Sequence, residues 1–512
     1  MKGSTSLIIA SSTLLSATSG LQLNKRHDPA VLSVNFEKRA RHVSDSLGRR
    51  ADNVVDMFVD KHGMRVSYWA NYTIGTPPQN LYAEMDTGSS DLLVLTKEIE
   101  ACKKEKCIGN IFNTVKSQTF DWVESEDQVH GSFGSGESWS GYYAKDSFSL
   151  GDVKLDSFQF VATDVFNATV AGIVSIFGVG LPIGQRAAKK FPSLPWALRN
   201  AGEINTAAYS LWLDDDQSGH FLFGGVNKAK YKGPLVTFPI PVTAPSDDEP
   251  DKLLVVMEGF GTTNDGSSTT IEFYPRSVLL DTGTIKSRLT EDMALYVLAT
   301  LGGVISETYG AMVPCEENPK YTLDFTFGEL TINVPLTYFT SKSNNVVGID
   351  GVSYCSLFYD PKATYIILGD DFLKGAYVVF DHENMEISLA QYNPDGEKDD
   401  IHEIVKNVPG ATKAKNIPMK FDPFDGTAMG DPTSVPAGLK TVSMTLLSSR
   451  TASASMTGDP MSTNAGLSIA QPTETGDAKG SDDEDSAAVR SLPGKVMSIV
   501  VFGIITGLLC IW

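Results

Sequence analysis

Two short motifs of nearly the same composition could place two carboxylates together. Residues 86–89 (DTGS) and 281–284 (DTGT) each follow an apolar stretch, and each precedes, at a similar interval, two apolar residues and a glycine at 176–178 and 367–369. A single Asp-Thr-Gly is usually a turn in which the aspartate accepts backbone amides. Two copies with matching downstream partners instead predict two similar lobes that each contribute one aspartate.

Two aspartates brought together in this way have a definite chemistry. Carboxylates about 3 Å apart cannot both ionise easily, so they share a proton and their pKa values separate. The ionised group can take a proton from water while the protonated group polarises a carbonyl. We expect Asp86 and Asp281 to act in this way as a unit, since the sequence does not say which is the base. Gly88 and Gly283 would let backbone amides approach the carboxylates.

The elements that position these motifs are expected to be strands. From residue 66 to residue 392, short alternating stretches such as 68–74 and 375–380 are separated by turns rich in Gly, Asp, Asn and Pro. Residues 291–301 form the clearest helical pattern. The fold class is therefore predicted to be all-β.

Composition and charge exclude several classes of protein. The 512-residue chain has 42 Lys and Arg against 62 Asp and Glu, a formal net charge of −20. A nucleic-acid partner is not expected, because such proteins present basic surfaces. The sequence contains no Cys-x-x-Cys, His-Glu-x-x-His or Gly-x-Ser-x-Gly pattern. We therefore expect no metal and no cofactor.

The N-terminus has the pattern of a secreted precursor. Residues 1–20 have a positive start, a short apolar run and small residues at the end, as in a signal peptide. A buried N-terminal helix is the alternative. Residues 21–50 contain three dibasic pairs, and the last is Arg49-Arg50. We expect 21–50 to be a pro-segment that is removed by cleavage after this pair.

The C-terminus has the pattern of a surface anchor. Residues 394–485 lose periodicity and become rich in Ser and Thr, which indicates a disordered stalk with O-linked sugars or a plain disordered linker. Residues 486–512 end in an apolar tail after a polar spacer, as in the signal for a glycosylphosphatidylinositol (GPI) anchor, with Asp485 and Ser486 as attachment candidates. A membrane-spanning tail is the alternative. We expect the secretory pathway to deliver the protein to the cell surface, anchored at the plasma membrane or cell wall.

Four cysteines lie outside the apolar tail that contains Cys510. An even number in a secreted chain predicts disulfides, although four cysteines allow three pairings and spacing alone does not choose among them. Cys102 and Cys107 would close a tight loop, and Cys315 and Cys355 a longer one.

Asn71 and Asn167 each begin an N-x-[ST] sequence, the acceptor for N-linked glycans. Asn71 lies in a stretch that is predicted to be a strand, which leaves its occupancy open.

The core resembles the pepsin-like aspartic proteases over residues 66–393. The similarity rests on residues 74–79 (IGTPPQ), on the two Asp-Thr-Gly motifs and on residues 366–373 (IILGDDFL). It implies a bilobal fold with a cleft between pseudo-twofold lobes, the N-terminal lobe at 51–240 and the C-terminal lobe at 241–393. The pro-segment, stalk and anchor signal further resemble the fungal yapsin branch.

The resemblance implies a function. It indicates an aspartic endopeptidase, made as a zymogen, that acts as a monomer on protein and peptide substrates at acidic pH. The yapsin resemblance also implies a preference for basic residues, for which Glu137 is a candidate counter-charge or else an ordinary solvated acid. A pepsin-fold module that only binds peptides or serves at the cell surface is the alternative.

The resemblance also implies roles for residues next to the aspartates. Thr87 and Thr282 match threonines that hydrogen-bond across the lobes beneath the catalytic pair. Ser89 and Thr284 match positions whose hydroxyls support the outer carboxylate oxygens.

A hairpin that covers the cleft, the flap, is expected at Phe133, Gly134, Ser135 and Gly136. The family usually has tyrosine at the Phe133 position and often tryptophan at the position of Leu93. Losing one of two hydrogen-bonding partners would strand a buried polar group, whereas losing both leaves an apolar contact. We therefore expect the flap to close by hydrophobic packing.

Overall fold

The structure is a computed structural model of the full chain. It describes residues 31–40, 66–103, 107, 110–124, 127–134, 136–151, 153–167, 173–214, 218–243, 249–306, 309–348, 351–360, 363, 365–396 and 398–422. The predicted signal peptide and anchor signal lie outside the described residues, as do Arg49, Arg50, Ser135, Asp485 and Ser486.

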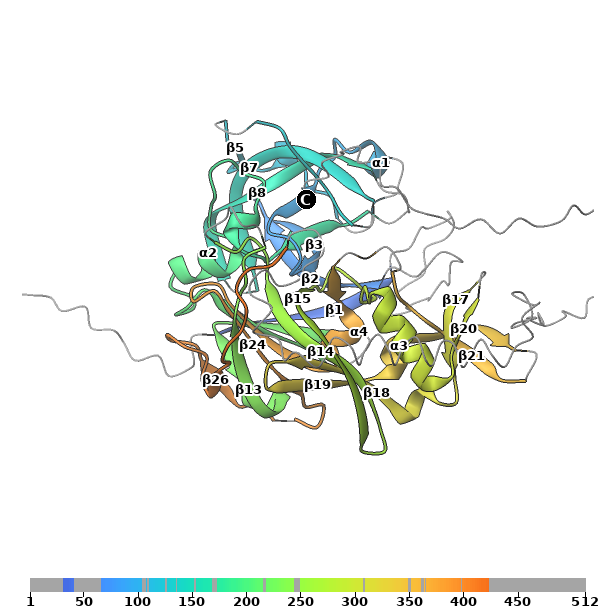
Figure 1. Cartoon of the computed structure of the whole chain (residues 1–512). Coiled ribbons are helices and arrows are strands. Elements are labelled where there is room, and N and C mark those ends of the chain that lie inside the picture. Colours follow the sequence, from blue (N-terminus) through green and yellow to red (C-terminus); the bar gives the residue numbers. More distant parts are fainter. Residues whose placement is uncertain are drawn as a thin grey trace, which may run out of the picture.

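The described residues are mostly β-strand, as predicted, and one large sheet runs through the molecule (Figure 1). This sheet has 15 strands, and β6 (Val129–Ser132) joins it beside β7. The other strands, in sheet order, are β26 (Ala411–Lys413), β13 (Tyr231–Pro239), β24 (Glu386–Tyr392), β23 (Ala376–Asp381), β10 (Ala208–Leu213), β11 (Ser218–Phe223), β1 (Leu32–Ala40), β2 (Val66–Ile74), β3 (Gln79–Asp86), β9 (Ser175–Gly178), β4 (Leu92–Leu95), β8 (Val153–Asn167), β7 (Ser138–Leu150) and β5 (Asp121–Trp122).

Three smaller sheets complete the strand arrangement. A five-stranded sheet contains β19 (Leu330–Pro335), β18 (Tyr321–Phe327), β14 (Leu254–Asn264), β15 (Ser267–Leu280) and β22 (Ile366–Leu368). A four-stranded sheet contains β16 (Val304–Ser306), β17 (Gly310–Pro314), β21 (Ser353–Leu357) and β20 (Thr340–Val347). The last sheet pairs β12 (Gly225–Asn227) with β25 (Ile401–Glu403).

Helices are short in the described ranges. The α-helices are α1 (Glu100–Lys103), α2 (Leu194–Asn200), α3 (Glu291–Leu301) and α4 (Asp370–Leu373). The 3-10 turns are η1 (Thr114–Lys116), η2 (Pro182–Gly184), η3 (Lys228–Lys230), η4 (Asn318–Lys320) and η5 (Leu336–Tyr338). The predicted helix at 291–301 is confirmed as α3. No helix in the described ranges has the length and apolar character that crossing a membrane requires.

The two Asp-Thr-Gly motifs occupy equivalent places in the fold. Asp86 ends β3, which runs parallel to β9 with Asp86 opposite Gly178. Leu280, the residue before Asp281, ends β15, which runs parallel to β22 with Leu280 opposite Leu368. The apolar-apolar-glycine segments are therefore the parallel neighbours of the two aspartate-bearing strands. This arrangement explains why the motifs recur at similar intervals.

Part of the expected pro-segment is a strand of the large sheet. Strand β1 pairs antiparallel with β11, where Leu32 lies opposite Phe223, and with β2, where Ala40 lies opposite Val66. Cleavage after residue 50 would therefore cut the chain behind a segment that is itself hydrogen-bonded to β2 and β11 within the sheet.

The described fold extends past residue 393, where the stalk was expected to begin. Strand β25 pairs with β12, and β26 runs parallel to β13. Ile404 and Phe421 are fully buried, and Val408 is nearly so. The expected boundary is therefore too early, because these widely spaced apolar residues anchor a segment that has no strand or helix periodicity of its own.

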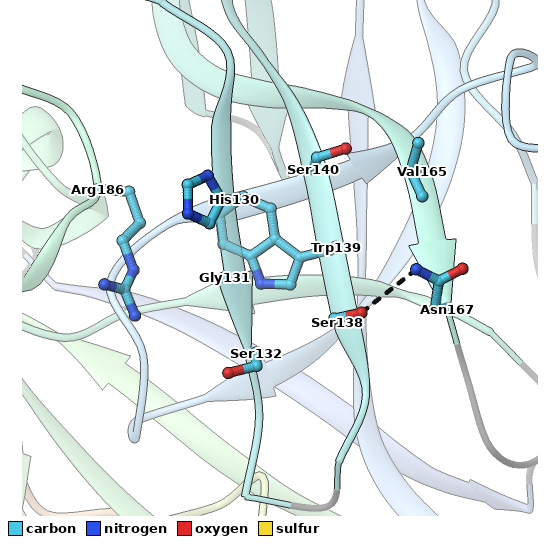
Figure 2. Close-up of a pocket in the computed structure, with 9 residues that line it drawn as sticks. All are labelled: His130, Gly131, Ser132, Ser138, Trp139, Ser140, Val165, Asn167 and Arg186. Carbon is cyan, nitrogen blue, oxygen red and sulfur yellow. Dashed lines mark hydrogen bonds between the residues drawn. The ribbon is translucent and has the colours of Figure 1, made fainter. Parts of the chain in front are cut away.

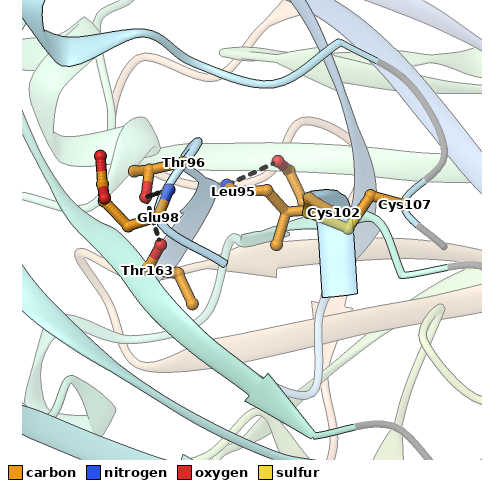
Figure 3. Close-up of a disulfide and its surroundings, with 7 residues drawn as sticks. Leu95, Thr96, Glu98, Cys102, Cys107 and Thr163 are labelled. Atoms are coloured by element: carbon orange, nitrogen blue, oxygen red, sulfur yellow. Dashed lines mark hydrogen bonds between the residues drawn. A yellow bond between two sulfur atoms is a disulfide. The ribbon is translucent and has the colours of Figure 1, made fainter. Parts of the chain in front are cut away.

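Both disulfides join the cysteine pairs that lie near each other in sequence. Cys102 of α1 is bonded to Cys107 (Figure 3), and Cys315 is bonded to Cys355 of β21. The predicted disulfides are thus confirmed, and the structure selects one of the three possible pairings.

Candidate active site

The two motif aspartates face each other across the lobes. Asp86 and Asp281 are 7% and 8% exposed. A Cβ atom added to Gly88 would lie 2.7 Å from Oδ1 of Asp281, and one added to Gly283 would lie 2.8 Å from Oδ1 of Asp86. The glycine of each motif therefore packs against the carboxylate of the other lobe, and any side chain there would separate the two aspartates.

Each carboxylate is held by two donors from its own motif. A glycine amide donates to one oxygen at 2.8 Å, and a hydroxyl three residues after the aspartate donates to the other oxygen. These donors are Gly88 and Ser89 for Asp86, and Gly283 and Thr284 for Asp281. The arrangement fixes both carboxylate planes before any substrate binds.

Two threonines connect the lobes beneath the carboxylates. The Thr87 hydroxyl donates to the Leu280 carbonyl at 2.7 Å and accepts from the Thr282 amide at 3.0 Å. The Thr282 hydroxyl donates to the Met85 carbonyl at 2.7 Å and accepts from the Thr87 amide at 3.1 Å. The four bonds form a reciprocal net across the pseudo-twofold axis, with the partners that the sequence resemblance implied.

The electrostatics of the pair favour a shared proton. Burial, followed by the negative charge of Asp281, raises the pKa of Asp86 well above its usual range. The hydrogen bond from Ser89 opposes this rise, and the charge of Glu84 adds to it. In the described part of the chain, no group of three or more His, Cys, Asp or Glu side chains is placed to hold a metal ion.

The predicted flap is a β-hairpin. Strands β6 and β7 pair with Ser132 opposite Ser138, and the Phe133 amide donates to the Glu137 carbonyl at 2.8 Å. Gly136 has a φ of +86°, a left-handed conformation that glycine adopts without steric cost. The Phe133 ring stacks on Phe166 of β8 with 6.5 Å between ring centroids.

A second aromatic residue of the flap hairpin was missed by the sequence analysis. Trp139 is 6% exposed and belongs to the same buried cluster as Leu93, with Phe133 packed against that cluster. Its ring lies over Gly131 of β6, where a Cβ would come 2.7 Å from the ring. The sequence signal was a glycine and a tryptophan on the two sides of the hairpin.

A buried acid near Asp86 was also missed. Asp91 is 5% exposed and accepts hydrogen bonds from the Tyr143 hydroxyl and the Arg186 amide, both at 2.9 Å. Burial raises its pKa, which these bonds partly offset. The available signal was an aspartate directly before the apolar stretch Leu92–Leu95.

Two glutamates near the site are buried. Glu137, which the sequence left open as a solvated acid, is 3% exposed and directly precedes the return strand of the flap. Glu84 is 5% exposed and precedes Asp86 by two residues in β3, so both side chains point to the same face of the sheet.

Comparison with known proteins decides the family. The family model described as eukaryotic aspartyl protease matches residues 67–392, well over half of the chain. The chain belongs to the eukaryotic aspartyl protease family. The protein is accordingly an aspartic-type endopeptidase, and the predictions of family, all-β bilobal pepsin-like fold and enzyme class are confirmed.

Several fungal aspartic endopeptidases are similar to this one. It is 31% identical over 458 residues to the probable aspartic-type endopeptidase OPSB of Arthroderma benhamiae, covering 84% of this chain and 91% of the relative. It is 30% identical over 409 residues to aspartic proteinase yapsin-3 of Saccharomyces cerevisiae, covering 76% and 78%. Aspartic proteinase MKC7 of the same yeast is 29% identical over 438 residues, covering 71% and 72%.

Proposed function

We propose that this aspartic endopeptidase hydrolyses peptide bonds at acidic pH with a water molecule activated by Asp86 and Asp281. The observation that carries the proposal is the symmetric carboxylate pair, in which each aspartate has its own two donors and packs against the glycine of the other lobe. Two fixed, buried carboxylates with one shared proton can act as base and acid in the same step.

The reaction returns the pair to its starting state. The ionised carboxylate takes a proton from water as the water oxygen attacks the scissile carbonyl carbon, and the protonated carboxyl donates to the carbonyl oxygen. As the C–N bond breaks, the amine takes one proton from the pair and a hydroxyl of the tetrahedral intermediate returns one. The pair again holds a single proton, and Ser89 and Thr284 keep both planes fixed throughout.

The acidic pH range follows from this shared proton. Activity requires one proton on the pair, and burial together with the charge of Asp281 raises the pKa of Asp86. Activity should fall as the pH rises and the shared proton is lost, and should fall again in strong acid when both groups are protonated.

Substitution of either aspartate tests the mechanism. Asp86→Asn and Asp281→Asn should each fold, melt within a few degrees of the wild type and lose nearly all acid proteolysis of a denatured protein substrate. Asp121→Asn, at an exposed position of β5, is the matched control and should keep full activity. Substantial turnover by either active-site variant would refute the mechanism.

A preference for basic substrate residues is part of the proposal. It is supported by two buried carboxylates, Glu84 on the face of β3 that carries Asp86 and Glu137 at the flap. An acid in a site of low dielectric attracts a lysine or arginine side chain more strongly than a solvated acid does. The kcat/KM ratio for matched peptides with lysine or norleucine at the cleavage site should fall in Glu84→Gln or Glu137→Gln. An unchanged ratio in both variants would refute these residues as the determinants.

We further propose maturation and anchoring at the cell surface. The chain would enter the secretory pathway, lose residues 1–20 and 21–50, and exchange its apolar tail for a GPI anchor near Asp485 and Ser486, with a yapsin-like relative as support. N-terminal sequencing of the active enzyme should then begin near Ala51. A phospholipase specific for such anchors should release it, unless it has been joined to the cell wall, whereas recovery of Trp512 in the surface protein would refute the anchor.

A further inference from the structure

A pocket, here called the hollow, lies between the flap hairpin and strand β8. Its volume is about 560 Å³, within the range of ordinary ligand pockets. Figure 2 shows Arg186 and His130 on one side of the Trp139 ring and Asn167 on the other. Residues of β6, β7 and β8 and the side chain of Arg186 line the hollow.

One residue of the lining, Asn167, can be covalently modified. It is the last residue of β8, it is exposed, and it lies opposite Ser138, the first residue of the flap return strand. Its side-chain amide nitrogen donates to the Ser138 hydroxyl at 3.3 Å, as Figure 2 shows. Residues 167–169 read Asn-Ala-Thr, an acceptor for N-linked glycans. An acceptor nitrogen therefore lies within the lining of a pocket.

We propose that Asn167 carries an N-linked glycan whose innermost sugars occupy this hollow and brace the flap hairpin. The glycan comes from a lipid-linked oligosaccharyl diphosphate. The amide nitrogen loses one proton and bonds to the anomeric carbon of the first sugar, while the bond from that carbon to the diphosphate oxygen breaks and the diphosphate leaves with the electron pair. The nitrogen keeps its second hydrogen, so its hydrogen bond to Ser138 survives the transfer.

The lining suits a sugar. A pyranose ring has apolar C–H faces and a rim of hydroxyl and acetamido groups. The hollow offers the Trp139 ring and the Val165 side chain to these faces. It also offers the Arg186 guanidinium and the hydroxyls of Ser132 and Ser138 to the rim.

The second acceptor, Asn71, does not lie beside this hollow. Asn71 is also exposed, but it lies inside β2, opposite Tyr82 of β3, and does not line the hollow. A glycan there would extend into solvent as a bulky surface group. Asn71 is therefore the matched control within the same chain.

The expected consequence is a less mobile flap. Strands β6, β7 and β8 all contribute to the lining, and their contacts set how often the hairpin opens. A sugar that touches His130 of β6 and stays bonded to Asn167 of β8 ties the outer strand of the flap to its base. Substrate enters beneath this hairpin, so the glycan would also moderate the opening step.

The first test asks whether the glycan is present. The inference rests on the secretory route proposed above, so one preparation of the full-length enzyme secreted by a fungal host serves for N-terminal sequencing, acid proteolysis and peptide mapping. Treatment with peptide-N-glycosidase in heavy-oxygen water should convert Asn167 to labelled aspartate. An unmodified Asn167 in secreted, active enzyme would overturn this inference and leave the proteolytic function standing.

The second test asks whether the sugars occupy the hollow. Thr169→Ala removes the acceptor sequence without altering a lining residue, and Thr169→Ser preserves it. Amide hydrogen exchange across residues 127–140 should be about threefold or more faster in Thr169→Ala, unchanged in Thr169→Ser and unchanged in Asn71→Gln. In a His130→Ala background the effect of Thr169→Ala should shrink, because one contact of the sugar is already gone. Equal exchange with and without the Asn167 glycan would overturn the proposal that the sugars occupy the hollow.

Discussion

The two lobes hold the loop after each aspartate in different ways. In the N-terminal lobe the buried acid is Asp91, on the loop itself, and it accepts from Tyr143 of β7 and from the Arg186 amide. Strand β7 begins at the predicted flap, so this acid joins the loop of Asp86 to that hairpin.

In the C-terminal lobe the buried acid lies on another element. Asp371 of α4 accepts from the amide and the hydroxyl of Ser287, six residues after Asp281, and the Ser287 hydroxyl also accepts from the Gly369 amide. Burial raises the pKa of Asp371 to about 6. These bonds connect parts of the lobe that are all buried, and none involves a hairpin over the site.

The difference shows how one scaffold serves two purposes. Around the carboxylates the lobes are equivalent, because one reaction needs both groups in the same geometry. One step further out, Asp91 connects the loop after Asp86 to a strand of the predicted flap hairpin, whereas the contacts of Asp371 stay among buried residues of its own lobe.

The largest effect is expected at the two motif glycines, each of which packs against the carboxylate of the other lobe. Gly88→Ala and Gly283→Ala would each place a methyl group within 2.8 Å of the opposite carboxylate. Both should lower kcat by about 100-fold or more, since small displacements of reacting groups have effects of this size. Kinetics of the two purified variants measure this. Retention of activity by only one variant would show that the lobes are not equivalent here.

The next largest effects are expected at the hydroxyl donors to the two buried acids, Asp91 and Asp371. Tyr143→Phe and Ser287→Ala each remove a hydroxyl donor to a buried carboxylate, so each should lower the free energy of unfolding by about 1–3 kcal/mol. Only Tyr143→Phe should also change catalysis, with kcat/KM lower by about fivefold, because it loosens the flap from the catalytic loop. Denaturation and kinetics on the same samples check both parts. Equal kinetic effects would remove the distinction between the lobes.

A pH effect is expected from the C-terminal lobe. Burial lowers the pKa of His382 to about 3, and neither ring nitrogen has a hydrogen-bond partner among the described residues. A lowered folded-state pKa means that stability is fully present above the usual value near 6.5 and is lost as the pH falls towards 3. Asp371, with its raised pKa, acts in the opposite sense and contributes stability that is lost as the pH rises from about 4 through 6.

Removing the histidine isolates its contribution. His382→Phe should reduce the loss of unfolding free energy between pH 7 and pH 4 by about 3 kcal/mol. Val405→Ala, at an exposed position that does not titrate, should leave that loss unchanged. Denaturant titrations at the two pH values provide the measurement, and an identical loss in His382→Phe and wild type would contradict the assignment.

The smallest effect is expected at the flap residues themselves. Phe133→Tyr should change kcat/KM by less than about twofold, because the ring packs against an apolar cluster and its new hydroxyl lacks an indole partner at Leu93. Adding Leu93→Trp should lower stability by about 1–3 kcal/mol, since that buried cluster already holds Trp139. A gain in activity from either change would show that the flap uses a polar latch.

The sequence predicted most of what lies along single strands. The paired motifs and the approach of the glycine amides to the carboxylates follow from residues at fixed offsets from Asp86 and Asp281. The threonine net was implied by the family resemblance of these motifs. Asp91 and Trp139 were missed because their partners come from other strands and loops, which no local spacing reveals. The packing of residues 398–422 onto the core was missed for the same reason, since Phe421 is fully buried and its amide donates to the carbonyl of Val242, far away in sequence.

The sequence by itself determined the class of chemistry, since a duplicated Asp-Thr-Gly with matching downstream strands leaves few alternatives to a shared-proton carboxylate pair. Only the tertiary structure decided which buried acids support the pair, what packs beneath the flap and which cysteines join. The physical reason is that motif residues act through backbone geometry within one strand or turn, which local sequence encodes. By contrast, the burial of Trp139 and the pocket beside Asn167 exist only once β6, β7 and β8 have paired in the folded protein.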